Sequence, residues 1–230
     1  MATSSRGSVG DPGPGRHGHT ETGAIPCAFI DRTRNYPMSD TRVAAIAGSL
    51  RDESYTRLGC ERALAAAEGY EGVEIDLLDL REFELPVFDA DERAVGDADE
   101  LTRRVRAADS VVLGTPVYHG SYSSALKNAL DYCGFDEFDE TTVGLLCVAG
   151  GAFPTTTLDH LRSVARAVNA WVVPHQVAIP RARNAFDDGE LLDGDVAERV
   201  DTLGRRMVEY ATIEPDPRTI EAKQNVGADD

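Results

Sequence analysis

Five short apolar segments, separated and followed by segments with helical spacing, constrain the fold of this 230-residue sequence more than any other feature. The predicted strands lie at residues 43–47, 73–78, 110–114, 143–149 and 170–177. The predicted helices lie at residues 54–68, 97–108, 122–132, 155–169 and 195–211, with a long acidic loop at 79–96. Nearly continuous apolar strands are typical of a parallel sheet that helices cover on both faces.

Right-handed crossovers leave few ways to connect five such units. Five strands favour an α/β, flavodoxin-like three-layer sandwich with a five-stranded parallel sheet of order 2-1-3-4-5. In that order the binding crevice lies at the carboxyl ends of the first, third and fourth strands. The loops that follow Ala47, Gly114 and Ala149 are therefore the candidate binding loops.

The loop after the first strand has the chemistry of a phosphate site. It leads into a helix N-terminus, where free backbone N–H groups and the helix dipole favour an anion. Side-chain donors are added by Ser49, Arg51, Ser54 and Thr56. The G-x-x-x-x-G-K and G-x-G-x-x-G phosphate-binding patterns are both absent. The alternative is an ordinary helix start, with Ser54 as the cap and Arg51 on the surface.

The loop after the third strand suits a planar ligand with polar edges. Pro116 fixes its backbone, Gly120 allows close approach, and Tyr118 and Tyr122 offer flat surfaces. Lys127 follows in the next helix and is one of only two lysines in the chain. Either a compact ammonium is required there, or Lys127 is a chance residue on an exposed helix face.

The loop after the fourth strand carries the paired glycines Gly150 and Gly151. Paired glycines would let a ligand touch the backbone. The alternative is that they only end the strand.

Sequence pieces in these loops resemble the NADPH-dependent FMN reductase family of the flavodoxin-like superfamily. They are Gly48-Ser49-Leu50-Arg51-x-x-Ser54, Thr115-Pro116-x-Tyr118, Ser124-Ala125-Leu126-Lys127-Asn128-x-Leu130-Asp131 and the LPVFDAD stretch at 85–91. The resemblance covers residues 41–212. Many members have Glu-Tyr-Asn after the proline, whereas this chain has Val117-Tyr118-His119, closer to members linked to sulfonate metabolism. The substrate of neither group therefore carries over.

The resemblance implies a bound FMN as cofactor. Its phosphate is expected on the first loop and its isoalloxazine ring against residues 116–119, with the glycine pair closing the other side. The implied cofactor-binding residues are Ser49, Leu50, Arg51, Ser54, Thr56, Pro116, Val117, Tyr118, His119, Gly120, Ser121, Gly150 and Gly151.

The implied activity is hydride transfer from NADPH or NADH to FMN, followed by electron transfer to a second small-molecule acceptor in a ping-pong cycle. The acceptor classes are a free flavin, a quinone, an azo compound or a metal oxyanion. No catalytic side chain is strictly needed: His119 either donates to the ring or acceptor, or only lines the pocket. Alternatives are a flavodoxin-like electron carrier and a non-catalytic FMN-binding protein. Family members are commonly oligomers, which implies a homodimer or homotetramer.

The net charge of −17 argues against DNA, RNA and anionic membranes as main partners. Abundant acidic residues with almost no lysine resemble the cytoplasmic proteins of salt-accumulating halophiles; the alternative is an acidic protein without that adaptation. The cysteines Cys27, Cys60, Cys133 and Cys147 form neither a C-x-x-C pair nor a zinc pattern. A reduced, cytoplasmic chain without a metal site is therefore expected.

The two ends of the sequence differ from residues 38–212, the predicted FMN-binding domain. Residues 1–37 are rich in Gly and Pro and slightly basic, and are expected to be a disordered leader; Met38 is a candidate start. His17 and His19 are not expected to bind a metal. Residues 213–230 are expected to be a disordered acidic tail. No signal peptide and no apolar run of membrane-spanning length is present.

Overall fold

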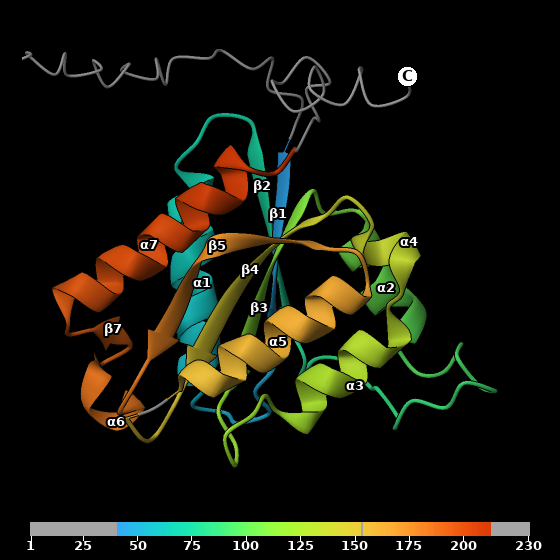
Figure 1. The fold of residues 1–230 in the computed structure, drawn as a ribbon, viewed down its shortest axis with the longest axis horizontal. Helices are drawn as coiled ribbons and strands as arrows, with labels where there is room; N and C mark the ends of the chain where they lie inside the picture. Colours follow the sequence, from blue (N-terminus) through green and yellow to red (C-terminus); the bar gives the residue numbers. More distant parts are fainter. Residues whose placement is uncertain (1–40, 153, 213–230) are drawn as a thin grey trace, which may run out of the picture. The chain divides into compact units, whose positions relative to one another are not determined.

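The computed structural model describes residues 41–152 and 154–212, which form a parallel sheet covered by helices (Figure 1). The strand order is β2-β1-β3-β4-β5. The strands are β1 (Thr41–Ala47), β2 (Val73–Asp79), β3 (Ser110–Pro116), β4 (Thr142–Val148) and β5 (Trp171–Ile179). All four neighbouring pairs are parallel, so the predicted sandwich and its strand order are confirmed.

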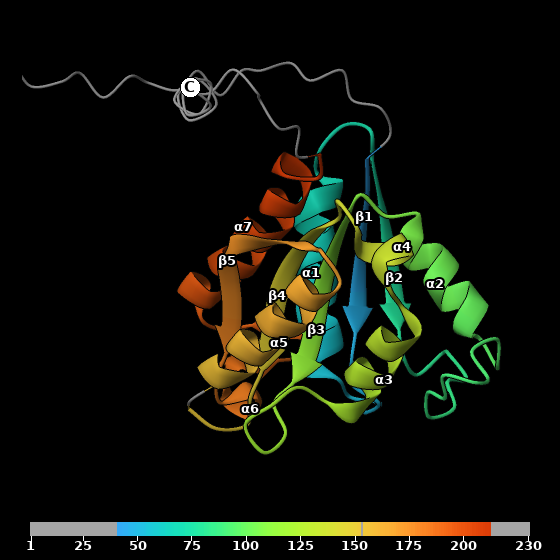
Figure 2. The same cartoon turned by 45° about the vertical axis from the view of Figure 1, so that its right-hand side comes forward.

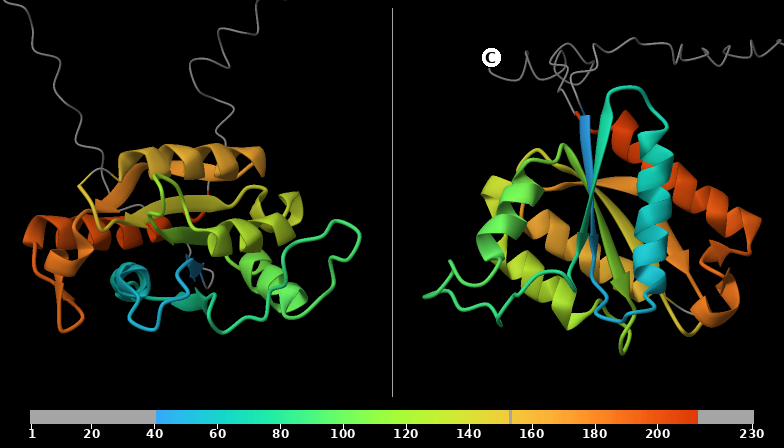
Figure 3. Two further views of the ribbon diagram at one scale, coloured as in Figure 1. Left: turned by 90° about the horizontal axis from the view of Figure 1, so that it is seen from below. Right: turned by 180° about the vertical axis from the view of Figure 1, so that it is seen from behind.

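Two helical layers cover the two faces of the sheet (Figure 3). One layer consists of α1 (Tyr55–Glu68) and α7 (Gly194–Glu209). The other consists of α2 (Ala98–Arg106), α3 (Ser124–Tyr132) and α5 (Thr155–Ala167). Alternate residues of β1 point to the two layers: Ala45 packs with the first and Ile46 with the second. Strands with two buried faces must be apolar along their length, which explains the strength of their sequence signal.

All ten predicted elements are present, with boundaries that agree within two residues. The expected helix at 122–132 begins at Ser124 because Ser123 is its cap, and its Oγ accepts a hydrogen bond from Leu126 N at 3.1 Å. β5 is an edge strand and tolerates Pro174, with a register shift against β4 between Val143 and Leu145.

Four short elements were not predicted. They are α4 (Phe135–Phe138), α6 (Ala182–Ala185), β6 (Phe186–Asp187) and β7 (Glu190–Leu191), and β6 pairs antiparallel with β7. Elements of two to four residues are too short to show a side-chain period in the sequence. We refer to residues 182–191, which contain α6, β6 and β7, as the 182–191 insert.

The three cysteines in the described part of the chain are buried and free. Desolvation by burial raises the pKa of Cys60, Cys133 and Cys147 to about 12 in each case, so these thiols are poor nucleophiles. Within the same residues no helix is both long and apolar enough to cross a membrane. The predictions for residues 1–37, which include His17, His19 and Cys27, for the candidate start Met38 and for residues 213–230 fall outside the described residues.

Candidate functional site

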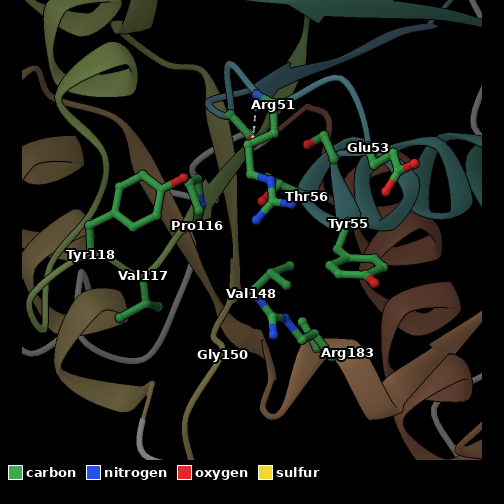
Figure 4. A pocket seen from close by; sticks show the side chains of 13 residues that line it. Arg51, Glu53, Tyr55, Thr56, Pro116, Val117, Tyr118, Val148, Gly150 and Arg183 are labelled. Atoms are coloured by element: carbon green, nitrogen blue, oxygen red, sulfur yellow. Dashed lines mark hydrogen bonds between the residues drawn. The ribbon is translucent and has the colours of Figure 1, made fainter.

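A cavity of about 240 Å³ is lined by residues that follow the carboxyl ends of β1 and β3. Figure 2 shows these two strands ending at the same edge of the sheet. The loops after β1, β3 and β4 and the 182–191 insert all contribute to its wall (Figure 4). The lining residues are Ser49, Arg51, Glu53, Ser54, Tyr55, Thr56, Pro116, Val117, Tyr118, Val148, Gly150, Ala182 and Arg183. The structure therefore brings together residues from all three predicted loops.

The loop between β1 and α1 presents hydrogen-bonding groups to this cavity. Ser49, Ser54 and Thr56 line the wall, and each is at most 3% exposed. Ser54 is the cap of α1, and its Oγ accepts a hydrogen bond from Arg57 N at 3.1 Å. The capping role and the wall position are thus combined in one residue. Free first-turn amides and buried hydroxyls at one point are the donors that an anion needs.

The backbone of this loop is packed closely against the neighbouring strand and helix. Gly48 N donates to Gly114 O at 2.8 Å, and Ser123 Oγ donates to Gly48 O at 2.5 Å. A Cβ on Gly48 would lie 2.7 Å from Leu126 Cβ, so a larger residue does not fit there. The N-terminal end of α1 is thereby held in one place relative to β3 and α3.

Asp79, the buried last residue of β2, supports the same loop through Arg81. Arg81 Nε donates to the Asp79 carboxylate at 3.0 Å, and Arg81 Nη1 donates to Asp52 O at 3.1 Å. Burial by itself would raise the pKa of Asp79, but the hydrogen bonds from Arg81 outweigh burial and hold the pKa below its ordinary value. Asp79 is therefore charged at neutral pH and fixes the Arg81 side chain.

Arg51 and Arg183 are the two cations on the cavity wall, and both are exposed. Neither forms an ion pair with any described residue, whereas Arg57 pairs with Glu61 and Arg104 with Asp76. In Figure 4 the Arg51 side chain reaches down from its loop and Arg183 reaches up from α6, toward the space between them. The cavity thus contains two guanidinium groups whose charges no carboxylate among residues 41–152 and 154–212 neutralises.

Pro116 and the two residues after it form the side of the cavity that faces α1. Pro116, Val117 and Tyr118 line it, and Tyr118 is 48% exposed. The buried Thr115 fixes this segment, because its Oγ1 donates to Pro116 O at 2.8 Å and accepts from Ser123 N at 2.9 Å. A rigid apolar wall of this kind suits the face of a planar ring.

The chain turns sharply beyond this wall. Tyr118 and Ser121 exchange backbone hydrogen bonds of 2.9 and 3.0 Å, with His119 at φ +50° and Gly120 at φ +79° between them. Two positive φ values in a two-residue turn are typical of type I′. His119 and Gly120 thus occupy the exposed tip, and Ser121 Oγ lies 3.0 Å from His160 Nδ1. None of these turn residues lines the cavity except Tyr118.

The loop after β4 is fastened to the start of α6. Arg181 N donates to Gly151 O and Ala182 N donates to Ala149 O, each at 2.9 Å. Gly150 lines the cavity, whereas Gly151 does not. These bonds place the 182–191 insert beside the three predicted loops.

Five residues of the predicted cofactor site lie off the cavity wall: Leu50, which is 62% exposed, His119, Gly120, Ser121 and Gly151. Lys127 does not line the cavity either, and its half-buried ammonium pairs with Asp131 one turn further along α3. A role of this lysine in the site stays a prediction. The wall residues that the sequence interpretation missed are Glu53, Tyr55, Val148, Ala182 and Arg183. The first three adjoin predicted residues or strand ends, whereas Ala182 and Arg183 had no sequence signal.

Comparison with known proteins gives consistent matches. The sequence model described as NADPH-dependent FMN reductase matches residues 41–184. The FMN-dependent NADPH-azoreductase of Staphylococcus haemolyticus (strain JCSC1435) is 35% identical over 161 residues, which span 65% of this chain and 84% of that protein. A protein of the same name from Staphylococcus aureus (strain USA300) is 46% identical over 79 residues, or 34% of this chain and 42% of that protein.

Solved structures of similar fold include an oxidoreductase from Corynebacterium diphtheriae, with a TM-score of 0.63 and 24% identity. The match covers 77% of this chain and 100% of that one. A flavoenzyme NAD(P)H:(acceptor) oxidoreductase from Paracoccus denitrificans has a TM-score of 0.63 and 22% identity. That match covers 74% of this chain and 97% of the other chain. At these identities the likeness concerns the fold.

Proposed function

This chain belongs to the NADPH-dependent FMN reductase family, and from that premise we propose that it uses NADPH to reduce a bound FMN and delivers the electrons to an azo compound. One observation carries the proposal. The cavity combines an unpaired guanidinium and a helix N-terminus on one side with a proline, a valine and a tyrosine ring on the other.

The residues of the cavity fit an FMN molecule, which has one phosphate and a flat ring system. Arg51 and the hydroxyls of Ser49, Ser54 and Thr56 match the phosphate, because charged and neutral donors converge at the start of α1. The wall formed by residues 116–118 matches the ring. Among the described residues the carboxylate of Glu53 is the only one that lines the cavity, and in Figure 4 it points away from the centre.

When bound, FMN would supply the redox chemistry, a ping-pong exchange of hydride from NADPH and electrons to an acceptor. The residues of the chain itself would bind the cofactor and orient it. Arg51 neutralises the phosphate, and the wall fixed by Thr115 limits the positions open to a planar group. A Cβ on Gly150 would meet no atom within 4 Å, so the loop after β4 leaves room at the cavity mouth for a second molecule. For His119, which lies at the tip of its turn and off the cavity wall, donation to the ring or acceptor stays one of two predictions, the other being that it only lines the pocket.

An azo compound is the proposed acceptor for two reasons. The Staphylococcus relatives are both named azoreductases. The half-exposed Tyr118 ring also offers a stacking surface to a flat aromatic molecule at the cavity mouth.

The test is anaerobic stopped-flow mixing of the FMN-loaded protein with NADPH, followed by addition of the azo dye methyl red. We expect rapid bleaching of the flavin absorbance and then decolorisation of the dye with recovery of the flavin spectrum. Flavin that binds but does not bleach would contradict the proposal and favour an electron carrier or a non-catalytic FMN-binding protein. Bleaching without dye reduction would contradict only the acceptor, and free flavin and a quinone would then be compared.

A further inference from the structure

Arg183 is a cation that the FMN site described above does not use. It lies on the cavity wall, is exposed, and forms no ion pair with a described residue. It comes from the 182–191 insert, whereas the donors assigned to the FMN phosphate come from the loop after β1 and the start of α1. Figure 4 shows it on the opposite side of the cavity from Arg51.

The backbone that carries Arg183 is held at several points. Ala182 is buried, and its N donates to Ala149 O at 2.9 Å. At the other end of α6, Leu192 N donates to Ala185 O at 2.9 Å. Phe186 then stacks on Tyr55, with ring centroids 5.0 Å apart and an interplanar angle of 19°. Because Tyr55 opens α1 and lines the cavity, the insert is packed directly against the anion-binding end of that helix.

The positive charge of Arg183 suits an anionic group other than the FMN phosphate. The single phosphate of FMN is matched by Arg51 and the donors of α1. NADPH differs from NADH by one 2′-phosphate, which carries most of two negative charges at neutral pH. An acidic side chain that bonds the ribose 2′-hydroxyl is the usual device for NADH, and an arginine is the device for the 2′-phosphate. Glu53 points away from Arg183 in Figure 4, so the group that faces the cavity there is the guanidinium.

We propose that Arg183 binds the 2′-phosphate of NADPH and so makes the enzyme select NADPH over NADH; this inference rests on the proposed function. A guanidinium can bond two phosphate oxygens at once, which gives direction as well as charge. Its exposure suits a nucleotide that binds and leaves in each cycle. The chain carries a net charge of −17, which repels a polyanionic nucleotide, so one unpaired cation at the cavity carries a large share of the discrimination.

The direct test measures binding of two half-nucleotides by titration calorimetry. The probes are adenosine 2′,5′-bisphosphate and AMP, which differ only in the 2′-phosphate. The Arg183→Gln variant is expected to bind the bisphosphate about tenfold more weakly than the wild type, and AMP less than twofold more weakly. The Arg183→Lys variant, which keeps the positive charge, is expected to recover part of the lost affinity for the bisphosphate. The control is Arg166→Gln, an exposed arginine of α5 without an ion pair and away from the cavity, which leaves both affinities unchanged. Equal weakening of both probes, or no weakening, would overturn the inference.

Steady-state kinetics separate this inference from the proposed function. The ratio of kcat/KM for NADPH to that for NADH is expected to fall about tenfold in Arg183→Gln, through a higher KM for NADPH, with FMN affinity unchanged. If FMN affinity falls and the ratio holds, Arg183 is a cofactor residue and the inference is wrong. If the wild type reduces FMN with neither nucleotide, the proposed function fails, and the bisphosphate titration still decides the role of Arg183.

Discussion

The two sides of the cavity are built in different ways. On one side, the loop between β1 and α1 is pressed against β3 and α3, and its hydroxyls are buried. On the other side, the 182–191 insert consists of a four-residue helix and a two-pair hairpin, and most of its residues are exposed. Each side presents one unpaired arginine, Arg51 or Arg183.

This difference matches two kinds of ligand. A cofactor that stays bound gains from donors fixed in advance, because less ordering is needed on binding. A substrate that must bind and dissociate in each cycle is better served by an exposed charge, which water can hydrate while the site is empty. In the two proposals made above, the buried side therefore holds FMN and the exposed side holds NADPH.

The largest effect is expected from filling the space beneath the buried side. A Cβ on Gly114 would lie 2.3 Å from Cys60 Sγ, so Gly114→Ala should lower the free energy of unfolding by about 3 kcal/mol. Urea denaturation measures the loss. Gly150→Ala is the matched control, because its Cβ would meet nothing within 4 Å, and its cost is expected within about 0.5 kcal/mol. Similar midpoints for the two variants would show that the two sides are equally loosely packed.

The next largest effect distinguishes the two arginines. Arg51→Gln should weaken FMN binding roughly 30-fold, because it removes a charge-assisted bond to the phosphate. Arg183→Gln should change the same affinity less than twofold. Fluorescence titration of the apo-proteins with FMN measures both. Comparable losses in the two variants would mean that both sides hold the cofactor.

A smaller effect is expected from loosening the exposed side. Phe186→Leu removes the stack on Tyr55 while keeping a buried apolar side chain, and should lower stability by about 1 kcal/mol. The preference for NADPH over NADH should fall several-fold, because the support of Arg183 is weakened. The affinity of the same variant for FMN is the internal control and should equal that of the wild type. A selectivity equal to that of the wild type would show that the stack does not position the insert.

The smallest expected effect is a change in stability that depends on Asp79 and appears only at acidic pH. Because the pKa of Asp79 is lower in the folded protein than in the unfolded chain, its ion pair with Arg81 stabilises the fold above the unfolded pKa. That contribution is lost as the pH falls below about 4 and through the lower folded pKa. The gap in urea midpoint between the wild type and Asp79→Asn should therefore be constant near neutral pH and narrow in acid. A gap that stays constant down to pH 3 would contradict this role.

Most of the fold was predictable because it depends on patterns that repeat over many residues. β3 and β4 are buried along their whole length, so their apolar runs were unmistakable. Ser54, at a strand-to-helix junction, lines the cavity. The positions of Leu50 and His119 were harder to foresee, because a loop residue can point either way and only the turn geometry decides.

The amino-acid sequence by itself determined the sheet, its strand order and the edge at which the loops gather, since apolar periodicity and crossover handedness leave few other arrangements. It also determined that Arg51 and three hydroxyls stand at the start of a helix. Only the tertiary structure showed that Lys127 is paired with Asp131 and that Arg183 reaches the cavity. The physical reason is that the 182–191 insert is too short to have a period of its own. Its position depends on backbone bonds to the loop after β4 and on one aromatic stack with Tyr55, contacts between segments distant in the sequence.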